Sequence, residues 1–568
     1  MDVIYQKGLS WKQSPKAIPN RPNALVVSYN NWDDYGYQTT FNAAIFKDGQ
    51  SLYEFALKIY IPDTSKTSAV FDNLIDAGWD GIFPPPGVKF LSLPSDIVFY
   101  EALLGAAGVD EAKRILLLIR DAGFLDKFSL PEDRQQVSDA IQAEVWKSSL
   151  TREAGAKKSF QDGWKAFEYA IPSGINDFTL YLPRQNDTIQ PVDFSFNSAL
   201  LPYDVNVLIG PNGVGKSYSL KTLVEYWLGV GAGEAAALEG REPFSNHPNI
   251  SKLILVSYSP FEEFTLDLKE TRLQEKDAYR YFGFRYQIEE DGKFRVGINR
   301  NLPASDSVES LSKAFSDDDT FDFMDTWIGK VDTIKEILAG AIDFDQLAFE
   351  IDEHFAPKPF EGVMVREINE RRYLIPYTPE SIKRAESHII KTEGVVFLKG
   401  DKRIALSSGQ RLFCYIVINV VGEIKKDSLV IIDEPELFLH PKLEVEFVGL
   451  LKKINKAFNS CAILATHSLS IARETPAKCV HVFRNLEDGL DVVHPPFETF
   501  GGDMQRISTY VFGDDSFSKP FEGWLTEKLD SLDDPRTLIS ALGKEVNEEL
   551  VVKILNYEGA HGRQDTIS

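Results

Sequence analysis

Long apolar runs are missing from this 568-residue sequence. No stretch reaches the roughly 18 apolar residues that a membrane-spanning helix needs. The first residues, MDVIYQKGLSWKQ, also have no apolar core of the kind found in a signal peptide. A transporter built on this chain would have to take its membrane span from another subunit. We therefore expect a cytoplasmic protein without membrane contact.

Cysteine is scarce, and the charge is strongly one-sided. Only Cys414, Cys461 and Cys479 occur, with no close pair of the metal-binding kind. Three scattered cysteines do not suit a disulfide framework, so we expect buried, reduced thiols. The formal net charge of −24 disfavours diffuse binding to nucleic acid or to anionic membranes. It does not exclude a local basic groove.

Internal repeats, low-complexity tracts and long heptad runs are also absent from the sequence, which argues against a long coiled-coil arm. Short apolar segments alternate with helical stretches after residue 205, as in a parallel sheet covered by helices. These predicted strands are Val205–Ile209, Leu253–Val256, Leu429–Ile432, Ala462–Ala465 and Cys479–Phe483.

A glycine-rich loop follows the first of these strands and precedes a predicted helix. Its glycines allow backbone N–H groups to turn inward around phosphates, and the helix presents its positive N-terminus to the same anion. Lys216 is expected to reach the β- and γ-phosphates, and Ser217 to bind Mg²⁺. The candidate nucleotide-binding residues of this loop are Gly210, Pro211, Asn212, Gly213, Val214, Gly215, Lys216, Ser217 and Tyr218.

Two further strands end in polar residues suited to hydrolysis. Asp433 and Glu434 directly follow the apolar run Leu429–Ile432. We expect Asp433 to bind Mg²⁺ and Glu434 to act as the general base that polarises the attacking water. His467 follows the strand Ala462–Ala465, where its side chain can contact a γ-phosphate.

The motif Leu406-Ser407-Ser408-Gly409-Gln410 lies one short helix upstream of Asp433. Serine and glycine at a helix start provide hydroxyl and backbone N–H donors for an anion. Such a motif is also a common helix cap when it stands alone. Ser407, Ser408, Gly409 and Gln410 are therefore candidate phosphate-binding residues by virtue of their order and spacing relative to the other motifs.

These four elements occur in the order of an ABC-type ATPase head and resemble one over roughly residues 195–485. The run from Asp433 to Pro441, DEPELFLHP, resembles stand-alone SMC/RecF-like, OLD-like and AAA_21-like ATPases of prokaryotic defence loci. The segments Ser257–Phe264, Tyr281–Arg285 and Tyr29–Tyr37 are similar to ATPases associated with Septu and retron systems. The resemblance implies ATP and Mg²⁺ as cofactors. It also implies that residues 407–410 cap the γ-phosphate bound by a second copy of the chain.

The sequence departs from that family in two places. ABC heads usually carry a glutamine just after the strand that ends near Ser257, whereas no glutamine here lies closer than Gln274. OLD-type proteins carry a metal-binding nuclease domain after the histidine. Here we find only Asp514 and Asp515 with scattered acids, which we interpret as an acidic loop before a helix, so we expect no nuclease activity of the chain itself.

The predicted fold is α/β, with a P-loop ABC-type head, a mostly helical insertion and an N-terminal α+β accessory region. We expect the boundaries to be 1–165 for the accessory region, 166–264 and 401–490 for the two parts of the head, 265–400 for the insertion, and 491–568 for a C-terminal helical region.

The functional expectation is an ATP-hydrolysing subunit of an anti-phage defence system. It would form an ATP-dependent head-to-head dimer or a higher homo-oligomer that controls an effector protein such as a nuclease, with nucleic acid kept open as a further partner. Two alternatives remain: a RecF/SMC-like repair ATPase acting on DNA, and the ATP-binding subunit of a transporter. Neighbouring genes would separate the three.

Overall fold

The computed structural model describes residues 1–167, 174–184, 188–266, 278–290, 293–324, 326–355, 363–437, 439–486, 489–513, 520–532, 534–543 and 548–557. The chain divides into two compact units, Met1–Asp503 and Met504–Ser568. No helix in these described ranges is long and apolar enough to cross a membrane.

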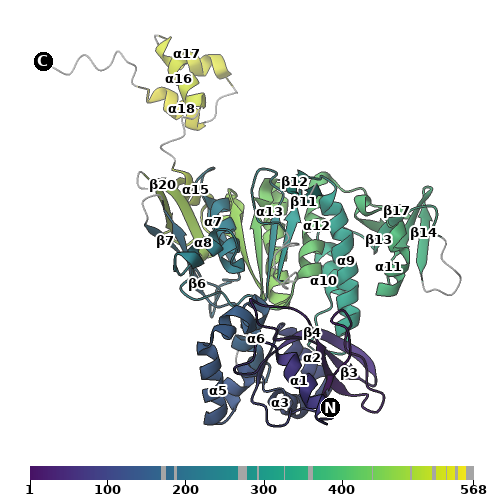
Figure 1. Ribbon diagram of the computed structural model, residues 1–568. Coiled ribbons are helices and arrows are strands. Elements are labelled where there is room, and N and C mark those ends of the chain that lie inside the picture. Colours follow the sequence, from purple (N-terminus) through teal and green to yellow (C-terminus); the bar gives the residue numbers. More distant parts are fainter. Residues whose placement is uncertain are drawn as a thin grey trace. The chain divides into compact units, whose positions relative to one another are not determined.

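The N-terminal part of the first unit is built on a mixed five-stranded sheet (Figure 1). Its strands run in the order β1 (Asp2–Gln6), β2 (Ala24–Tyr29), β3 (Thr40–Lys47), β4 (Gln50–Tyr60) and β5 (Leu91–Pro94), with β1 parallel to β2 and the rest antiparallel. The helices that follow are α1 (Thr67–Asp76), α2 (Val98–Ala107), α3 (Val109–Leu118), α4 (Ala122–Phe128), α5 (Pro131–Gln142) and α6 (Ala154–Asp162). Phe41, Phe71 and Phe99 are fully buried in their common core.

The Tyr29–Tyr37 run of this part has a structural explanation. Asp34 and Lys58 are both fully buried, and their charged atoms lie 3.3 Å apart. Arg152 also pairs with Asp34 at 2.7 Å, and Glu153 pairs with Lys58 at 3.1 Å. Buried charges are stable only when they are paired. The run therefore ties the loop after β2 to strand β4 and to the segment before α6.

A seven-stranded sheet forms the centre of the first unit, in the order β10-β9-β18-β19-β8-β20-β21. Its strands are β8 (Val205–Ile209), β9 (Lys252–Ser257), β10 (Tyr279–Gly283), β18 (Ser428–Asp433), β19 (Cys461–Thr466), β20 (Val480–Leu486) and β21 (Gly489–Val493). All neighbours are parallel except β20 and β21. Every residue of β8 and β18 is buried, because helices cover both faces of a parallel sheet. The predicted α/β fold class is thereby confirmed.

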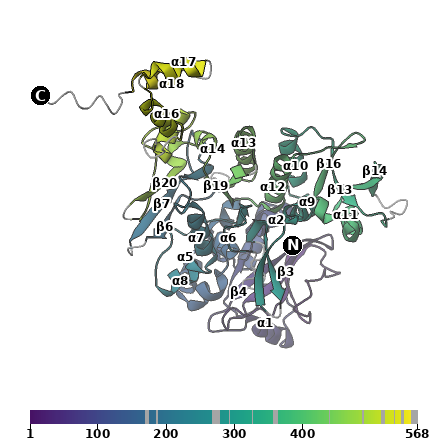
Figure 2. The same ribbon diagram turned by 90° about the horizontal axis from the view of Figure 1, so that it is seen from above.

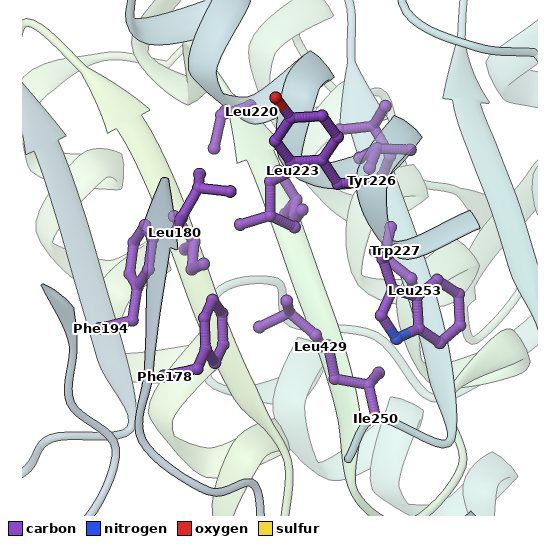
Figure 3. Packing of buried hydrophobic residues seen from close by; sticks show 14 of the residues in the cluster. Phe178, Leu180, Phe194, Leu220, Leu223, Tyr226, Trp227, Ile250, Leu253 and Leu429 are labelled. Carbon is purple, nitrogen blue, oxygen red and sulfur yellow. The ribbon is translucent and has the colours of Figure 1, made fainter. Parts of the chain in front are cut away.

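The core of this sheet is closed by helix α7 (Lys216–Leu228) and by the hairpin β6 (Phe178–Pro183) and β7 (Ile189–Phe194). Figure 3 shows Leu220 and Leu223 of α7 in one buried cluster with Leu253 and Leu429 of the central strands. Phe178 and Phe194 of the hairpin belong to the same cluster. This packing fixes the position of the helix that begins at Lys216.

Residues 265–400 contain the expected helices and also strands. Long α9 (Leu302–Phe321) and α10 (Lys330–Ala339) pack beside α12 (Ser408–Glu423), as Figures 1 and 2 both show. An antiparallel sheet runs in the order β14 (Met364–Ile368), β15 (Arg371–Ile375), β13 (Gln346–Ile351), β16 (Val395–Lys399) and β17 (Lys402–Arg403). The hairpin β11 (Arg285–Glu290) and β12 (Lys293–Ile298) and the short α11 (Pro379–Ala385) complete the described part.

The expectation of a mostly helical stretch is therefore too simple. Strands β14 and β15 are short and rich in charge, and only pairing across the sheet reveals them. Strand β10, moreover, belongs to the central sheet although it lies within residues 265–400.

The second unit is small and helical. It contains α15 (Met504–Phe512), α16 (Pro520–Asp530), α17 (Arg536–Leu542) and α18 (Glu548–Leu555). Leu525, Leu529, Leu538 and Ile554 form its core. The acidic pair Asp514 and Asp515 lies outside the described residues.

Candidate functional site

Three neighbouring strands of the central sheet end at one place. In the parallel register Asp433 pairs with Ala465, and Thr466 pairs with Ile209. The residues that follow β8, β18 and β19 are therefore brought to the same carboxyl edge. Ligands bind at this edge in open α/β sheets.

The loop from Gly210 to Gly215 has the conformation of an anion cradle. Gly213 and Gly215 adopt φ values of +76° and +100°, which favour glycine. A Cβ atom on Gly210 would collide with the carbonyl oxygen of Phe483. Helix α7 begins at Lys216 without a side-chain cap, so the N–H groups of its first turn are directed at the loop. This arrangement fits a phosphate chain.

Lys216 lies at the centre of this loop with only 5% of its surface exposed. Its Nζ donates to the carbonyl oxygens of Gly210 and Pro211, both at 3.0 Å, and lies 2.9 Å from Nε2 of His467. Burial lowers the pKa of Lys216 to about 8, although the nearby carboxylate of Glu434 acts in the opposite direction. A bound phosphate would supply the negative charge that this ammonium group needs.

Ser217 and Asp433 offer the oxygen ligands that Mg²⁺ prefers. The hydroxyl of Ser217 donates to Oδ1 of Asp433 at 3.0 Å, and the hydroxyl of Ser257 lies 3.4 Å from Oδ2. Burial raises the pKa of Asp433 to about 7, and the neighbouring Glu434 adds to this effect. A divalent cation here would favour the ionised carboxylate, so the donor set fits Mg²⁺ held together with phosphate oxygens.

Glu434 is oriented by its backbone. Its φ of +49° lies in the left-handed region, and its N–H donates to the carbonyl of Ala465 at 2.8 Å. Oε1 lies 3.6 Å from Nε2 of His467. The imidazole lowers the pKa of Glu434, although partial burial opposes this. An ionised carboxylate beside the phosphate loop suits a general base.

Two further acidic side chains, which the sequence motifs do not assign to the site, lie near it. Glu436 accepts a hydrogen bond from the backbone N–H of His467 at 2.5 Å. Glu262 follows β9, near the position where a glutamine was expected, and burial followed by repulsion from Glu434 raises its pKa. For Glu262, the available signal was the Glu262-Glu263 pair soon after Ser257. Glu436 stands within the DEPELFLHP run, but nothing in that run assigns it a role.

The other candidate phosphate ligands lie apart from this cluster. Ser407 caps α12: its hydroxyl accepts from the N–H of Gln410 at 3.3 Å, and the side chain of Gln410 accepts from the N–H of Ser407 at 3.1 Å. Ser407 and Ser408 are exposed. Within the described part of the chain, no hydrogen bond or ion pair joins residues 407–410 to Lys216.

The N-termini of helices α7 and α12 nevertheless lie at the same edge of the central sheet. Helix α7 follows β8 and helix α12 precedes β18, and these strands run in the same direction. A helix that connects to a parallel strand runs back across it, so both N-termini open at the carboxyl edge. In the loop itself, Tyr218 is 55% exposed, Asn212 is exposed, and Val214 packs against the core.

The central part of the chain is similar to a known family. A family model described as AAA_21, "AAA domain, putative AbiEii toxin, Type IV TA system", matches residues 205–473. These residues are a P-loop ATPase-type domain. The phosphate loop, Ser407–Gln410, Asp433, Glu434 and His467 all fall within the matched range of this ATPase domain.

Two curated proteins are similar to the chain. Protein ea59 of Escherichia phage lambda is 24% identical over 564 residues, which cover 95% of this chain and 93% of that protein. The methionine import ATP-binding protein MetN 1 of Enterococcus faecalis is 26% identical over 175 residues, covering 30% of this chain and 47% of that protein. The first similarity extends well beyond the ATPase domain, whereas the second is confined to a shorter segment.

Solved structures give a more distant likeness. The SMC head domain from Thermotoga maritima aligns at 12% identity and a TM-score of 0.26, covering 57% of this chain and all (100%) of that chain. Stu0660 of Streptococcus thermophilus aligns at 10% identity and a TM-score of 0.26, covering 56% of this chain and 76% of that chain. TM-scores this low give no basis for transferring a function to the ATPase domain.

Proposed function

We propose that this chain binds ATP with Mg²⁺ and hydrolyses it to ADP and phosphate at the carboxyl edge of the central sheet. The observation that carries the proposal is the position of His467, whose Nε2 lies 2.9 Å from Nζ of Lys216 and 3.6 Å from Oε1 of Glu434. The hydrogen-bonded pair Ser217 and Asp433 belongs to the same site. Four chemically distinct roles in phosphoryl transfer meet there: phosphate binding, metal binding, proton acceptance and γ-phosphate contact.

Each side chain has a defined task in this mechanism. The N–H groups of the loop and the start of α7 bind the phosphates, and Lys216 exchanges the carbonyl oxygens of Gly210 and Pro211 for phosphate oxygens. Mg²⁺ held by Ser217 and Asp433 would neutralise charge on the phosphates. Glu434 accepts a proton from the attacking water, and His467 contacts the γ-phosphate.

A second copy of the chain would complete the site. The exposed Ser407 hydroxyl and the N–H groups of the first turn of α12 open at the same edge as the phosphate loop, and no hydrogen bond or ion pair between described residues joins the two. The proposal is that these groups cap the nucleotide of the partner in a head-to-head dimer, which would then form and separate with ATP binding and hydrolysis.

We extend the proposal to an anti-phage role in which the dimer controls an effector protein such as a nuclease. A phage-encoded relative that aligns along nearly the whole chain supports a link to phage biology. The similarity to a transport ATPase does not favour a transporter, because it covers only 30% of this chain. Co-purification with the product of a neighbouring gene, and protection of cells from phage, would test this extension.

The ATPase proposal is tested with Lys216→Ala. Loss of the ammonium group that meets the β- and γ-phosphates should abolish tight ATP binding and hydrolysis, measured by calorimetry and phosphate release. Lys221→Ala is the matched control, because Lys221 lies on the same helix and pairs only loosely with Glu225 at 3.8 Å. Wild-type ATP affinity in Lys216→Ala would show that the site has been assigned wrongly.

A further inference from the structure

The turn that carries His467 is held by a carboxylate from another strand connection. Glu436 lies in the 3-10 turn η5 (Pro435–Leu437), directly after Asp433 and Glu434. Its Oε1 accepts from the backbone N–H of His467 at 2.5 Å. The position of the His467 backbone is thereby linked to the segment that carries the proposed general base.

A second carboxylate holds the next residue of the same turn. The hydroxyl of Ser468 donates to Oε2 of Glu444 at 2.5 Å, and Glu444 is 8% exposed on helix α13 (Pro441–Ala457). The Ser468 hydroxyl also accepts from the N–H of Ile471 and so caps helix α14 (Leu469–Arg473). Consecutive residues of the turn are thus bound to two acids that both follow β18.

The location of Glu436 is electrostatically unfavourable. Its second oxygen, Oε2, is buried and has no hydrogen-bond partner in the described part of the chain. Burial raises the pKa of Glu436, although hydrogen bonds with the His467 backbone and the Thr466 side chain act in the opposite direction. A buried carboxyl group of this kind lowers stability unless its remaining contacts compensate. Its Oε1 is held by the backbone N–H of His467.

We propose that Glu436 is a positioning residue for ATP hydrolysis, and that Glu444 is a second anchor of the turn that carries His467. By holding the N–H of His467, Glu436 keeps the imidazole between Nζ of Lys216 and Oε1 of Glu434, at 2.9 and 3.6 Å. In this role Glu436 acts through His467 rather than on the substrate itself. This inference rests on the proposed ATPase function and adds to it a reason why the acid three residues after Asp433 matters.

Three substitutions of Glu436 distinguish the effect of its side-chain length from the effect of its negative charge. Glu436→Gln keeps the length of the side chain and an oxygen acceptor, so it should retain kcat within about twofold of wild type. Glu436→Asp keeps the charge but withdraws the oxygen by one methylene, and Glu436→Ala removes it. Both should lower kcat about tenfold, with a smaller change in KM for ATP, because the misplaced group acts on the hydrolysis step rather than on binding.

Glu263→Ala is the control, because Glu263 is an exposed carboxylate near the same edge and should leave kcat unchanged. If Glu436→Ala fails to fold, as judged by melting, the contrast between glutamine and aspartate still decides. A wild-type kcat in Glu436→Asp overturns the proposal. So does a kcat of Glu436→Gln that is as low as that of Glu436→Ala. If Lys216→Ala abolishes ATP hydrolysis but all three Glu436 variants keep the wild-type kcat, only the positioning role is wrong. If the wild-type protein does not hydrolyse ATP, both proposals are wrong.

Discussion

Glu434 combines an unfavourable backbone conformation with an ionised side chain. Left-handed φ values cost a non-glycine residue about 1 kcal/mol, and such residues cluster at functional sites. Here the conformation is fixed by the hydrogen bond from its N–H to Ala465. The Glu434 carboxylate lies 3.6 Å from the imidazole of His467. The strain is thus tied to the geometry of the proposed site.

Glu434→Gln tests the role of this carboxylate. The amide has nearly the same shape but cannot accept a proton, so ATP should still bind while hydrolysis slows by about 10²–10⁴-fold. Single-turnover phosphate release and ATP titration would measure the two effects separately. Turnover at the wild-type rate would mean that another group, such as Glu262, activates the water.

At this scale, local motifs predict part of the site. The phosphate loop, Asp433 and His467 each follow a recognisable strand, and the structure brings them together at one edge. Glu436 could not be found in this way, because its contact is with a backbone N–H on another strand connection. Sequence patterns do not encode such contacts between connections that are distant in the chain.

Among the elements, the buried strands of the central sheet were the easiest to predict. Runs such as Leu429–Ile432 are uninterrupted and apolar because both faces are covered. Strands β14 and β15 carry charged residues and could be recognised only from their antiparallel pairing. Helix α12 shows a further limit: its capping box is visible in the sequence as Ser407 and Gln410, but a cap and a phosphate site use the same residues.

The N-terminal part depends on a buried ion cluster that can be tested by stability. Lys58→Ala would remove the common partner of Asp34 and Glu153, whose side chains are only 0% and 3% exposed, respectively. We expect a loss of about 3–5 kcal/mol in the free energy of unfolding, measured by urea denaturation. The exposed pair Lys335–Asp332 supplies the control, since Lys335→Ala should have little effect.

The pH dependence of this cluster follows from Asp34. Burial opposes its ionisation, but the charge of Lys58 and hydrogen bonds, including one from Ser149, hold the pKa of Asp34 below its ordinary value. A lowered folded pKa gives stability that is present above the unfolded pKa and is lost as the pH falls through the folded pKa. The difference between wild type and Lys58→Ala should therefore narrow in acid; a gap that widens there would contradict the assignment.

At the scale of the first unit, the N-terminal part and the proposed nucleotide site meet opposite edges of the central sheet. The connection between α12 and β18 carries Lys425 and Lys426, which pair with Asp96 and Glu101 at 2.8 and 2.9 Å. These contacts lie where β18 begins, whereas Asp433 lies where it ends. The same short connection therefore joins the N-terminal part to helix α12, which Ser407 caps, and to strand β18, which ends at Asp433.

If two copies of the chain build each ATP site, as proposed, two inactive variants should restore activity when they are mixed. Ser407→Asp keeps the helix cap but places a negative charge where the partner's phosphate would lie. It should bind ATP and melt like wild type, yet hydrolyse almost none. Lys216→Ala should also be inactive, because it cannot bind the nucleotide.

In a mixed dimer, the intact phosphate loop of one variant would face the intact Ser407 of the other. Equal amounts of the two inactive proteins should therefore recover about a quarter of the wild-type rate of phosphate release, as expected when half of the dimers have one whole site of two. A mixture that remains as inactive as its components, or wild-type activity in Ser407→Asp alone, would contradict the account.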